Sequence, residues 1–396
     1  MKYYDNIIIG SGIAGLYMAH NIKKNLKETY IILEKNDKKM VGGRVCIRNF
    51  HGINVNGGAG VGRIKKDFLL MKLLDELNLL YNKININIQF SNNIKNHVDV
   101  MKTFKFIKKS FDNSYSNLTF KEFALTILNK KEYKDFRIAT GLSDYENEDV
   151  IQTLKNYGMD DNSNELEAIS IPWKDLINKL IERIDIKNIK FNSDVEKIIN
   201  NENKYEIYLK DNNSFVCNKV YIATDIDTIR KLLNKENIYK EIKGQVFLRV
   251  YAKFSGESIK IMDEYVKKTT IVSTSLYKII KINLNIYMIC YSDNKGAKDT
   301  MKLINLDKNY NNLTELLKKS LDINENIKLK IDDIICFYWK NGTHYYKPLN
   351  KKLYKTRNDF VKKVQNPKKN MFVIGEAVSM KHGWSEGALE SVEKIL

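Results

Sequence analysis

The chain has few residues of the kinds that cross-link a fold or bind a metal. It holds 4 cysteines in 396 residues, and no two of them form a Cys-x-x-Cys pair. Such scattered cysteines argue against a zinc site and a disulfide framework, and they indicate a reducing compartment. They are Cys46, Cys217, Cys290 and Cys336. The 5 histidines are isolated as well, so we predict no metal site.

Long hydrophobic runs are also absent. No apolar segment approaches the roughly 20 residues that a helix needs to cross a bilayer. The first predicted strand begins so close to the N-terminus that no signal peptide fits before it. We therefore expect a soluble, intracellular protein of the cytoplasm, or of a virion or viral factory if its gene is viral.

Acidic residues are scarce relative to basic ones, and the formal net charge is +18. An excess of this size fits a polyanionic partner. Abundant Lys, Asn, Ile and Tyr with only 3 prolines are also typical of an AT-rich genome, and we favour composition bias as the cause. Residues 347–370 carry nine Lys or Arg against one Asp. We favour a solvated loop face there over a docking surface for nucleic acid or an acidic protein.

A glycine-rich turn stands between the first strand and the first helix. Residues 6–9 form an apolar strand suited to a parallel sheet covered on both faces, and residues 16–26 have helical spacing. In such a turn Gly10 permits the tight bend and Gly12 lets the backbone approach a pyrophosphate. Gly15 lets the helix and the strand pack closely. The glycine pattern alone is weak evidence for a nucleotide-binding site, so the residues around it decide the interpretation.

An acidic residue completes the pattern. The next predicted strand, TYIILEKN, ends in Glu34, which lies 19 residues after Gly15. An acid at this distance accepts hydrogen bonds from ribose hydroxyls, while the N-terminus of the helix offers free N–H groups to phosphates. We predict that a dinucleotide binds here.

The rest of the pattern predicts an α/β fold: a Rossmann-type dinucleotide-binding domain with an interleaved α+β substrate domain. Helical spacing dominates one central segment, alternating strands follow it, and a strand, a turn and a helix close the chain. We expect the first domain to comprise residues 1–80, about 181–240 and 365–396. The second comprises about 81–180 and 241–364, with its helical part at 95–180 and its sheet part at 243–345.

Two further segments identify the dinucleotide by resemblance. They are MVGGRV, at residues 40–45, and VIGEAVSMKHGWSEGALES, at residues 373–391. Together with the first turn they closely resemble the FAD-binding pattern of the flavin-containing amine oxidase family, which includes monoamine and polyamine oxidases. Protoporphyrinogen oxidases and phytoene desaturases are more distant relatives. The resemblance implies FAD, held non-covalently because no cysteine adjoins Trp384.

The resemblance also assigns FAD contacts residue by residue. Gly57 to Ala59 match the segment that runs beside the flavin ring, Val195 matches an adenine contact, and residues 386–388 begin a helix that faces the flavin pyrimidine. The full set is Gly10, Gly12, Gly15, Glu34, Lys35, Gly42, Gly43, Arg44, Gly57, Gly58, Ala59, Val195, Gly375, Glu376, Glu386, Gly387 and Ala388.

The family places two aromatic side chains on either side of the substrate nitrogen. Trp384 matches one of them, and the segment WKNGTHYYKPL resembles the strand that supplies the other. On that strand Tyr345 is the best match, with His344 and Tyr346 as neighbours. Aromatic faces suit an amine, whether neutral or cationic.

One position departs from the family. Amine-oxidising members carry a lysine at the start of a strand that resembles FLRVYAKF, and here Arg249 takes that place, or Leu248 with a shift of one residue. Arginine stays protonated and cannot share the proton chemistry of a lysine. It could hold a substrate carboxylate, bias the flavin, or simply face solvent.

These patterns predict an FAD-dependent oxidoreductase that oxidises a small-molecule amine or amino acid by hydride transfer to flavin N5. O2 would be the acceptor and would yield hydrogen peroxide. A protoporphyrinogen-oxidase-like or desaturase-like dehydrogenase is an alternative, and it predicts a long apolar tunnel. A flavin-binding protein without catalysis, serving structure or a partner, predicts a blocked path to the flavin.

Overall fold

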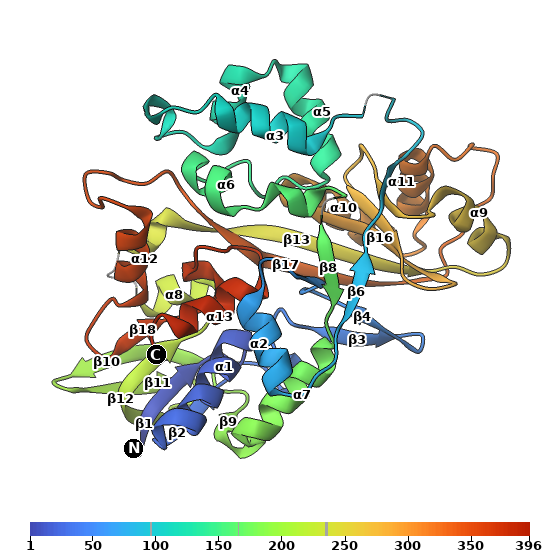
Figure 1. Ribbon diagram of the computed structural model, residues 1–396. Helices are drawn as coiled ribbons and strands as arrows, with labels where there is room; N and C mark the ends of the chain where they lie inside the picture. The colour runs from blue at the N-terminus through green and yellow to red at the C-terminus, as the bar shows by residue number, and fades with distance from the viewer. Residues whose placement is uncertain (96, 165, 234–236) are drawn as a thin grey trace.

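Two large β-sheets organise the chain in the computed structural model, which describes residues 1–95, 97–164, 166–233 and 237–396 (Figure 1). The first sheet has seven strands in the order β10-β11-β12-β1-β2-β9, and β18 also pairs with β12. Its strands are β1 (Lys2–Ile9), β2 (Tyr30–Leu33), β9 (Ile189–Lys190), β10 (Val195–Asn201), β11 (Lys204–Leu209), β12 (Ser214–Ile222) and β18 (Met371–Val373). Both chain ends lie at this sheet (Figure 1).

The centre of the first sheet is parallel and buried on both faces. β1 pairs in parallel with both β2 and β12, and Ile7, Ile8 and Ile9 are all buried. This burial explains why β1 is a continuous apolar run rather than an alternating one. One face packs on α1 (Ile13–Asn21), α2 (Phe68–Glu76), α7 (Trp173–Ile184) and α13 (Ser385–Glu393). The other packs on α8 (Ile226–Leu232) and α12 (Arg357–Gln365).

The packing of α7 bears on the predicted domain limits. Leu176, Ile177 and Leu180 of α7 lie in the same hydrophobic cluster as α1. The limit expected near residue 181 therefore falls inside a helix that covers the first sheet. The strong amphipathic spacing of α7 identified the helix, but spacing alone does not say which sheet a helix covers.

The second sheet has six strands in the order β17-β13-β16-β15-β14-β7. They are β7 (Ile88–Phe90), β13 (Ile242–Lys253), β14 (Thr269–Ile271), β15 (Lys278–Lys281), β16 (Ile286–Asp293) and β17 (Asp333–Tyr346). One face packs on α9 (Glu257–Tyr265), α10 (Asn294–Leu306) and α11 (Asn311–Leu321). The other face contributes side chains to a cavity that is described below.

A separate helical layer lies at the top of Figure 1, beyond the second sheet. It comprises α3 (Val100–Lys109), α4 (Phe120–Ile127), α5 (Lys130–Thr140) and α6 (Val150–Asn156), which share one aromatic-rich core. Capping boxes start two of these helices, Thr119 with Glu122 at α4 and Asn129 with Glu132 at α5. This layer carries Asp144 to the cavity on the loop after α5.

Short strands connect the parts. They are β3 (Ile47–Phe50) with β4 (Ile53–Asn56), and β5 (Val61–Arg63) with β8 (Glu167–Ser170) and β6 (Asn82–Asn85). The predicted α/β class with a Rossmann-type domain is confirmed. In the described part of the chain, no helix combines the length and the apolar character needed to span a membrane.

Candidate cofactor and substrate site

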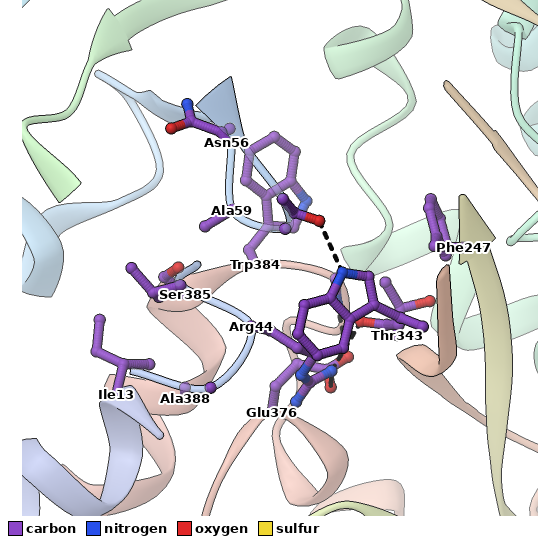
Figure 2. A pocket seen from close by; sticks show the side chains of 18 of the residues that line it. Ile13, Arg44, Asn56, Ala59, Phe247, Thr343, Glu376, Trp384, Ser385 and Ala388 are labelled. Carbon is purple, nitrogen blue, oxygen red and sulfur yellow. Dashed lines mark hydrogen bonds and ion pairs between the residues drawn. The ribbon is translucent and has the colours of Figure 1, made fainter. Parts of the chain in front are cut away.

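A single elongated cavity of about 1160 Å³ runs between the two sheets. At one end it is lined by the glycine turn before α1 and by the end of β2. At the other end it is lined by the start of α13 and by side chains of β13, β15, β16 and β17. Figure 2 shows part of this wall, with Arg44 and Glu376 near Thr343, and Trp384 and Ala388 from the start of α13.

The first glycine turn is shaped by close backbone contacts. Gly10 has φ +103°, a conformation that favours glycine, and a side chain there would meet the Ala223 carbonyl oxygen. A Cβ at Gly15 would lie 2.1 Å from the Gly10 carbonyl oxygen. Gly15 therefore packs the helix on the turn and does not line the cavity. By contrast, a Cβ at Gly12 would have no neighbour within 4 Å, because Gly12 borders the open cavity.

The start of α1 is free to bind an anion. Gly12 is its N-cap, no side chain caps it, and its first turn holds no acidic residue. Unpaired N–H groups at a helix N-terminus attract phosphate. Gly42 and Gly43 pack on this turn, since the Gly42 N–H donates to the Ser11 carbonyl at 2.9 Å. Both glycines line the cavity beside Gly12.

Glu34 lies where β2 ends and is buried. Its Oε2 accepts hydrogen bonds at 2.8 Å from the N–H and the hydroxyl of Ser11, and its Oε1 accepts two from Asn36 at 2.9 Å. The carboxylate therefore ties the glycine turn to β2. Lys35 and Val195 line the cavity beside it.

A buried ionic cluster holds the middle of the cavity. Glu376 accepts hydrogen bonds from Arg44 Nη1 at 2.9 Å and from His344 Nδ1 at 2.5 Å. Its other oxygen accepts from the N–H groups of His344 and Gly383. Burial alone would raise the pKa of Glu376, but His344 and Arg44 outweigh it and hold that pKa well below its usual range.

His344 is buried beside Glu376. Burial lowers its pKa against the pull of Glu376. Its Nε2 accepts a hydrogen bond from the Ile226 N–H at 3.4 Å, and its Nδ1 donates to Glu376. Arg44 forms an ion pair with the same carboxylate at 2.9 Å. Gly375, just before Glu376, also lines the cavity.

The segment from Gly57 to Gly60 forms one wall of the cavity. Its backbone is held at both ends, because Trp339 Nε1 donates to the Gly57 carbonyl and Trp173 Nε1 donates to the Gly60 carbonyl, both at 2.7 Å. A Cβ at Gly58 would lie 2.0 Å from the Arg44 carbonyl oxygen. The segment is therefore anchored at both ends and packed closely on the backbone of Arg44.

The start of α13 closes the far end. Trp384 is its N-cap residue, lines the cavity, and has Arg63 Cζ 3.7 Å from its ring centroid. Arg63 is itself fixed by ion pairs with Asp67 and Asp161 at 2.6 and 2.8 Å. A cation held over the indole face stabilises the position of the ring.

Like Gly15, Glu386 and Gly387 belong to the set assigned to cofactor contact but do not line the cavity. Glu386 turns its carboxylate to the N–H groups of Leu69 and Leu70 at the start of α2, at 3.1 and 3.0 Å. A Cβ at Gly387 would lie 2.1 Å from the Lys381 carbonyl oxygen. Neither residue lines the cavity, whereas Ala388 does. Glu386 and Gly387 instead fix the start of α13 against its neighbours.

The second predicted aromatic residue is also not at the cavity. Tyr345 lies two residues beyond Thr343, which is the last residue of β17 in the cavity wall. Tyr345 therefore lies outside the cavity lining, and its role stays a prediction. The aromatic side chain that β17 contributes to the lining is that of Trp339, at the start of the segment WKNGTHYYKPL. His344 and Tyr346, on the other face of the strand, are buried in the core.

Arg249 of β13 reaches the cavity from the second sheet. Its Nη1 donates to the Asn56 carbonyl at 3.1 Å, and its Cζ lies 4.4 Å from the ring centroid of Tyr291. Its Nη2 lies beside Gly60, since a Cβ there would come within 3.2 Å of it. The solvent-facing alternative for Arg249 is wrong, because the residue is only 8% exposed.

No motif in the sequence indicates the group of ionisable residues that lies next to Arg249. Lys278 lines the cavity, and burial lowers its pKa to about 8 although Asp144 and Asp293 oppose this. Burial, together with Asp293, raises the pKa of Asp144 to about 7. Burial likewise raises the pKa of Asp293 to about 6, against its hydrogen bonds from Ser143. Perturbed groups of this kind are typical of functional sites.

The fold and the cavity match known proteins. Residues 8–77 match the family described as NAD(P)-binding Rossmann-like domains. A double mutant of putrescine oxidase matches with a TM-score of 0.78 and 12% identity, over 100% of this chain and 98% of that one. Putrescine oxidase bound to putrescine matches with a TM-score of 0.77 and 12% identity, over 99% and 98%.

Cyclohexylamine oxidase from Brevibacterium oxydans IH-35A matches with a TM-score of 0.75 and 12% identity, over 99% of this chain and 97% of that one. A comparison with curated protein sequences gave no match. Because the structural matches span the whole chain, it has the amine oxidase fold. The resemblance drawn from the glycine turns and the C-terminal segment is confirmed at the level of fold.

Proposed function

We propose that the protein is an FAD-dependent oxidoreductase that oxidises an amine or amino acid with O2 as acceptor. The observation that carries this proposal is the continuity of the cavity. It joins an anion-binding turn beside Gly12 to an aromatic and ionic chamber beside Trp384, Trp339 and Arg249. A dinucleotide that reaches from one to the other would bring its ring to the chamber.

The residues present fit FAD. The open space beside Gly12 and the uncapped start of α1 suit a pyrophosphate. Glu34 lines the cavity beside them, although each of its oxygens already accepts two hydrogen bonds, from Ser11 or from Asn36. The Gly57–Gly60 segment lines the cavity with no side chain larger than that of alanine, which suits a flavin ring. All four cysteines lie in the described part of the chain, and none of them lines the cavity. No thiol is therefore placed to form a covalent bond to the flavin, which supports non-covalent binding.

When bound, the flavin would accept a hydride from the C–H bond next to the amine nitrogen and pass two electrons to O2, giving hydrogen peroxide. The resulting imine hydrolyses in water. The chain's own side chains would orient the substrate and exclude water. Trp384 and Trp339 offer aromatic faces to the amine, and Asp144 Oδ and Lys278 Nζ exchange protons near neutral pH.

Two features favour amine oxidation over the alternatives. A desaturase-like enzyme predicts a long apolar tunnel, whereas the chamber beside Trp384 combines isoleucines with Arg249, Lys278 and Asp144. A flavin-binding protein without catalysis predicts a blocked path, but the glycine turn and these charged groups line one cavity. Charged groups at the reacting end suit a polar, ionisable substrate.

Anaerobic mixing of the purified holoprotein with a panel of amines and amino acids tests the proposal. We expect at least one of them to bleach the flavin absorption, and air to restore it with release of hydrogen peroxide. Each equivalent of substrate should yield one of peroxide. A flavin that no member of the panel bleaches would contradict amine oxidation.

A further inference from the structure

Arg249 is a buried cation without a carboxylate partner among residues 1–95, 97–164, 166–233 and 237–396. It is 8% exposed, and in that part of the chain its Nη1 donates to the neutral carbonyl of Asn56. The phenol groups of Tyr291 and Tyr251 also hydrogen-bond to it, and none of these partners is a carboxylate. A buried charge is costly unless it is paired, so a guanidinium held in this way calls for an anion.

The unused donors of Arg249 lie at the cavity. A guanidinium has five N–H groups, and its fork matches a carboxylate with two parallel hydrogen bonds. Nη2 lies beside Gly60, where the missing side chain leaves it uncovered, and Gly60 lines the cavity. An anion bound there would lie next to the Gly57–Gly60 segment.

A second cation lies close by. Lys278, also 8% exposed, has its Nζ 5.8 Å from the ring centroid of Tyr291, the same ring that Arg249 covers at 4.4 Å. Its Nζ donates to the neutral Oδ1 of Asn162 at 3.3 Å. Asp144 and Asp293 balance part of this charge, and both Lys278 and Asp144 face the cavity.

The strand that carries Lys278 leads outward along an apolar wall. Lys278, Ile280 and Ile282 all line the cavity, and Ile282 is 37% exposed at its outer end. Since a strand rises by about 3.3 Å per residue, the outer isoleucine lies roughly 13 Å from the lysine. Further isoleucines of the wall are Ile84, Ile86 and Ile88. The inner end is therefore cationic and the outer end apolar.

From this arrangement we infer that Arg249 and Lys278 form a subsite for a carboxylate, and that the substrate is an amino acid with an apolar side chain. The inference rests on the proposed function for the oxidation of the amino acid, whereas binding of the carboxylate at Arg249 does not depend on that function. The carboxylate contacts Arg249, the amino group lies toward Trp384 and Asp144, and the apolar side chain extends along Ile280 toward Ile282. A simple amine without an acidic group would leave Arg249 unpaired.

Calorimetric titration of the holoprotein with 3-phenylpropanoate and with 3-phenylpropanamide tests the subsite without any turnover. The acid and the amide share a skeleton and neither carries an amine to oxidise. We expect the acid to bind at least tenfold more tightly than the amide. The variant Arg249→Met should lose that preference, and Arg249→Lys should keep part of it. Equal binding of acid and amide by the wild type would overturn the inference.

Control experiments distinguish loss of the carboxylate subsite from other effects of the substitutions. Lys260→Met removes an exposed cation that pairs with Glu257 and lies outside the cavity lining, so it should leave acid binding unchanged. Thermal unfolding shows whether Arg249→Met folds. If Arg249→Met alters the flavin spectrum but binds the acid as tightly as the wild type, Arg249 serves the flavin and the inference is wrong.

The two proposals fail in different ways. Binding of the acid without bleaching by any amino acid would contradict the oxidase and keep the subsite. Bleaching by amines that lack a carboxylate, with no preference for acid over amide, would keep the oxidase and remove the subsite.

Discussion

A side chain at Gly12 should separate binding of the cofactor from folding. Gly12 has φ −68° and ψ 173°, which any residue adopts, and a Cβ there meets nothing within 4 Å. In Gly12→Val the protein alone should therefore fold, at a cost of about 1 kcal/mol for a poorer N-cap residue. The valine would occupy the space through which the pyrophosphate approaches the start of α1.

The expected loss of binding follows from the contacts removed. A phosphate at this turn accepts charge-assisted hydrogen bonds, each worth about 1.5–3 kcal/mol. Loss of two costs at least about 3 kcal/mol, which weakens FAD binding by roughly 100-fold or more. Titration of the cofactor-free protein with FAD, followed by quenching of flavin fluorescence, measures this change, and urea unfolding measures the stability.

Gly15→Ala in the same turn is the matched contrast. Its Cβ would lie 2.1 Å from the Gly10 carbonyl oxygen, so it should destabilise the protein by about 1–3 kcal/mol or more through overpacking. Retention of FAD at wild-type affinity in Gly12→Val would refute the assignment of this turn. So would an unfolding midpoint of Gly12→Val as low as that of Gly15→Ala.

Three further changes test other parts of the cavity. Glu376→Gln breaks a buried ion pair and should lower the free energy of unfolding, measured by urea titration, by about 3–5 kcal/mol. The control Glu182→Gln changes an exposed ion pair and should have no measurable effect. Equal unfolding midpoints for the two variants would show that the buried cluster does not stabilise the fold. Trp384→Ala should lower kcat/KM for the amine about tenfold with unchanged FAD content, and an unchanged rate would place the amine elsewhere. Binding of 3-phenylpropanoate should weaken as pH rises from 6 to 9. Over this range Asp144, with a pKa of about 7, gains negative charge, and Lys278, with a pKa of about 8, loses its positive charge. An affinity that does not change with pH would contradict a role for either group.

The sequence was sufficient where the determinants are local. The apolar run of β1, the spaced glycines and the acid at the end of β2 lie within 34 residues, and they predict the turn that borders the cavity. The helix predicted from Ser385 is α13. Helical structure extends to Leu26 as predicted, as α1 followed by a π-helix over Ile22–Leu26, but it begins at Ile13, three residues before the predicted start.

The place of Tyr345 relative to the cavity depends on how far the wall extends along β17. Residues 339–343 line the cavity, and Tyr345 lies beyond them, paired with Lys243 of β13. Where a strand leaves a cavity wall is set by the elements packed around it, which the sequence of the strand does not show. The role of Tyr345 therefore stays a prediction.

The charged chamber was hidden for a different reason. Asp144 lies on the loop after α5, Lys278 on β15 and Arg249 on β13, and only the folded chain brings them together. Arg357 shows the converse. It belongs to the basic segment 347–370, yet its guanidinium is buried against Asp149 at 2.8 Å, so part of that charge serves the fold.

The flavin content of the purified protein tests the central claim most directly. We predict a yellow protein that carries one FAD per chain, and denaturation should release that FAD intact because no thiol holds it. A colourless protein that takes up no added FAD would contradict the claim, since the cavity that joins Gly12 to Trp384 would then have another occupant.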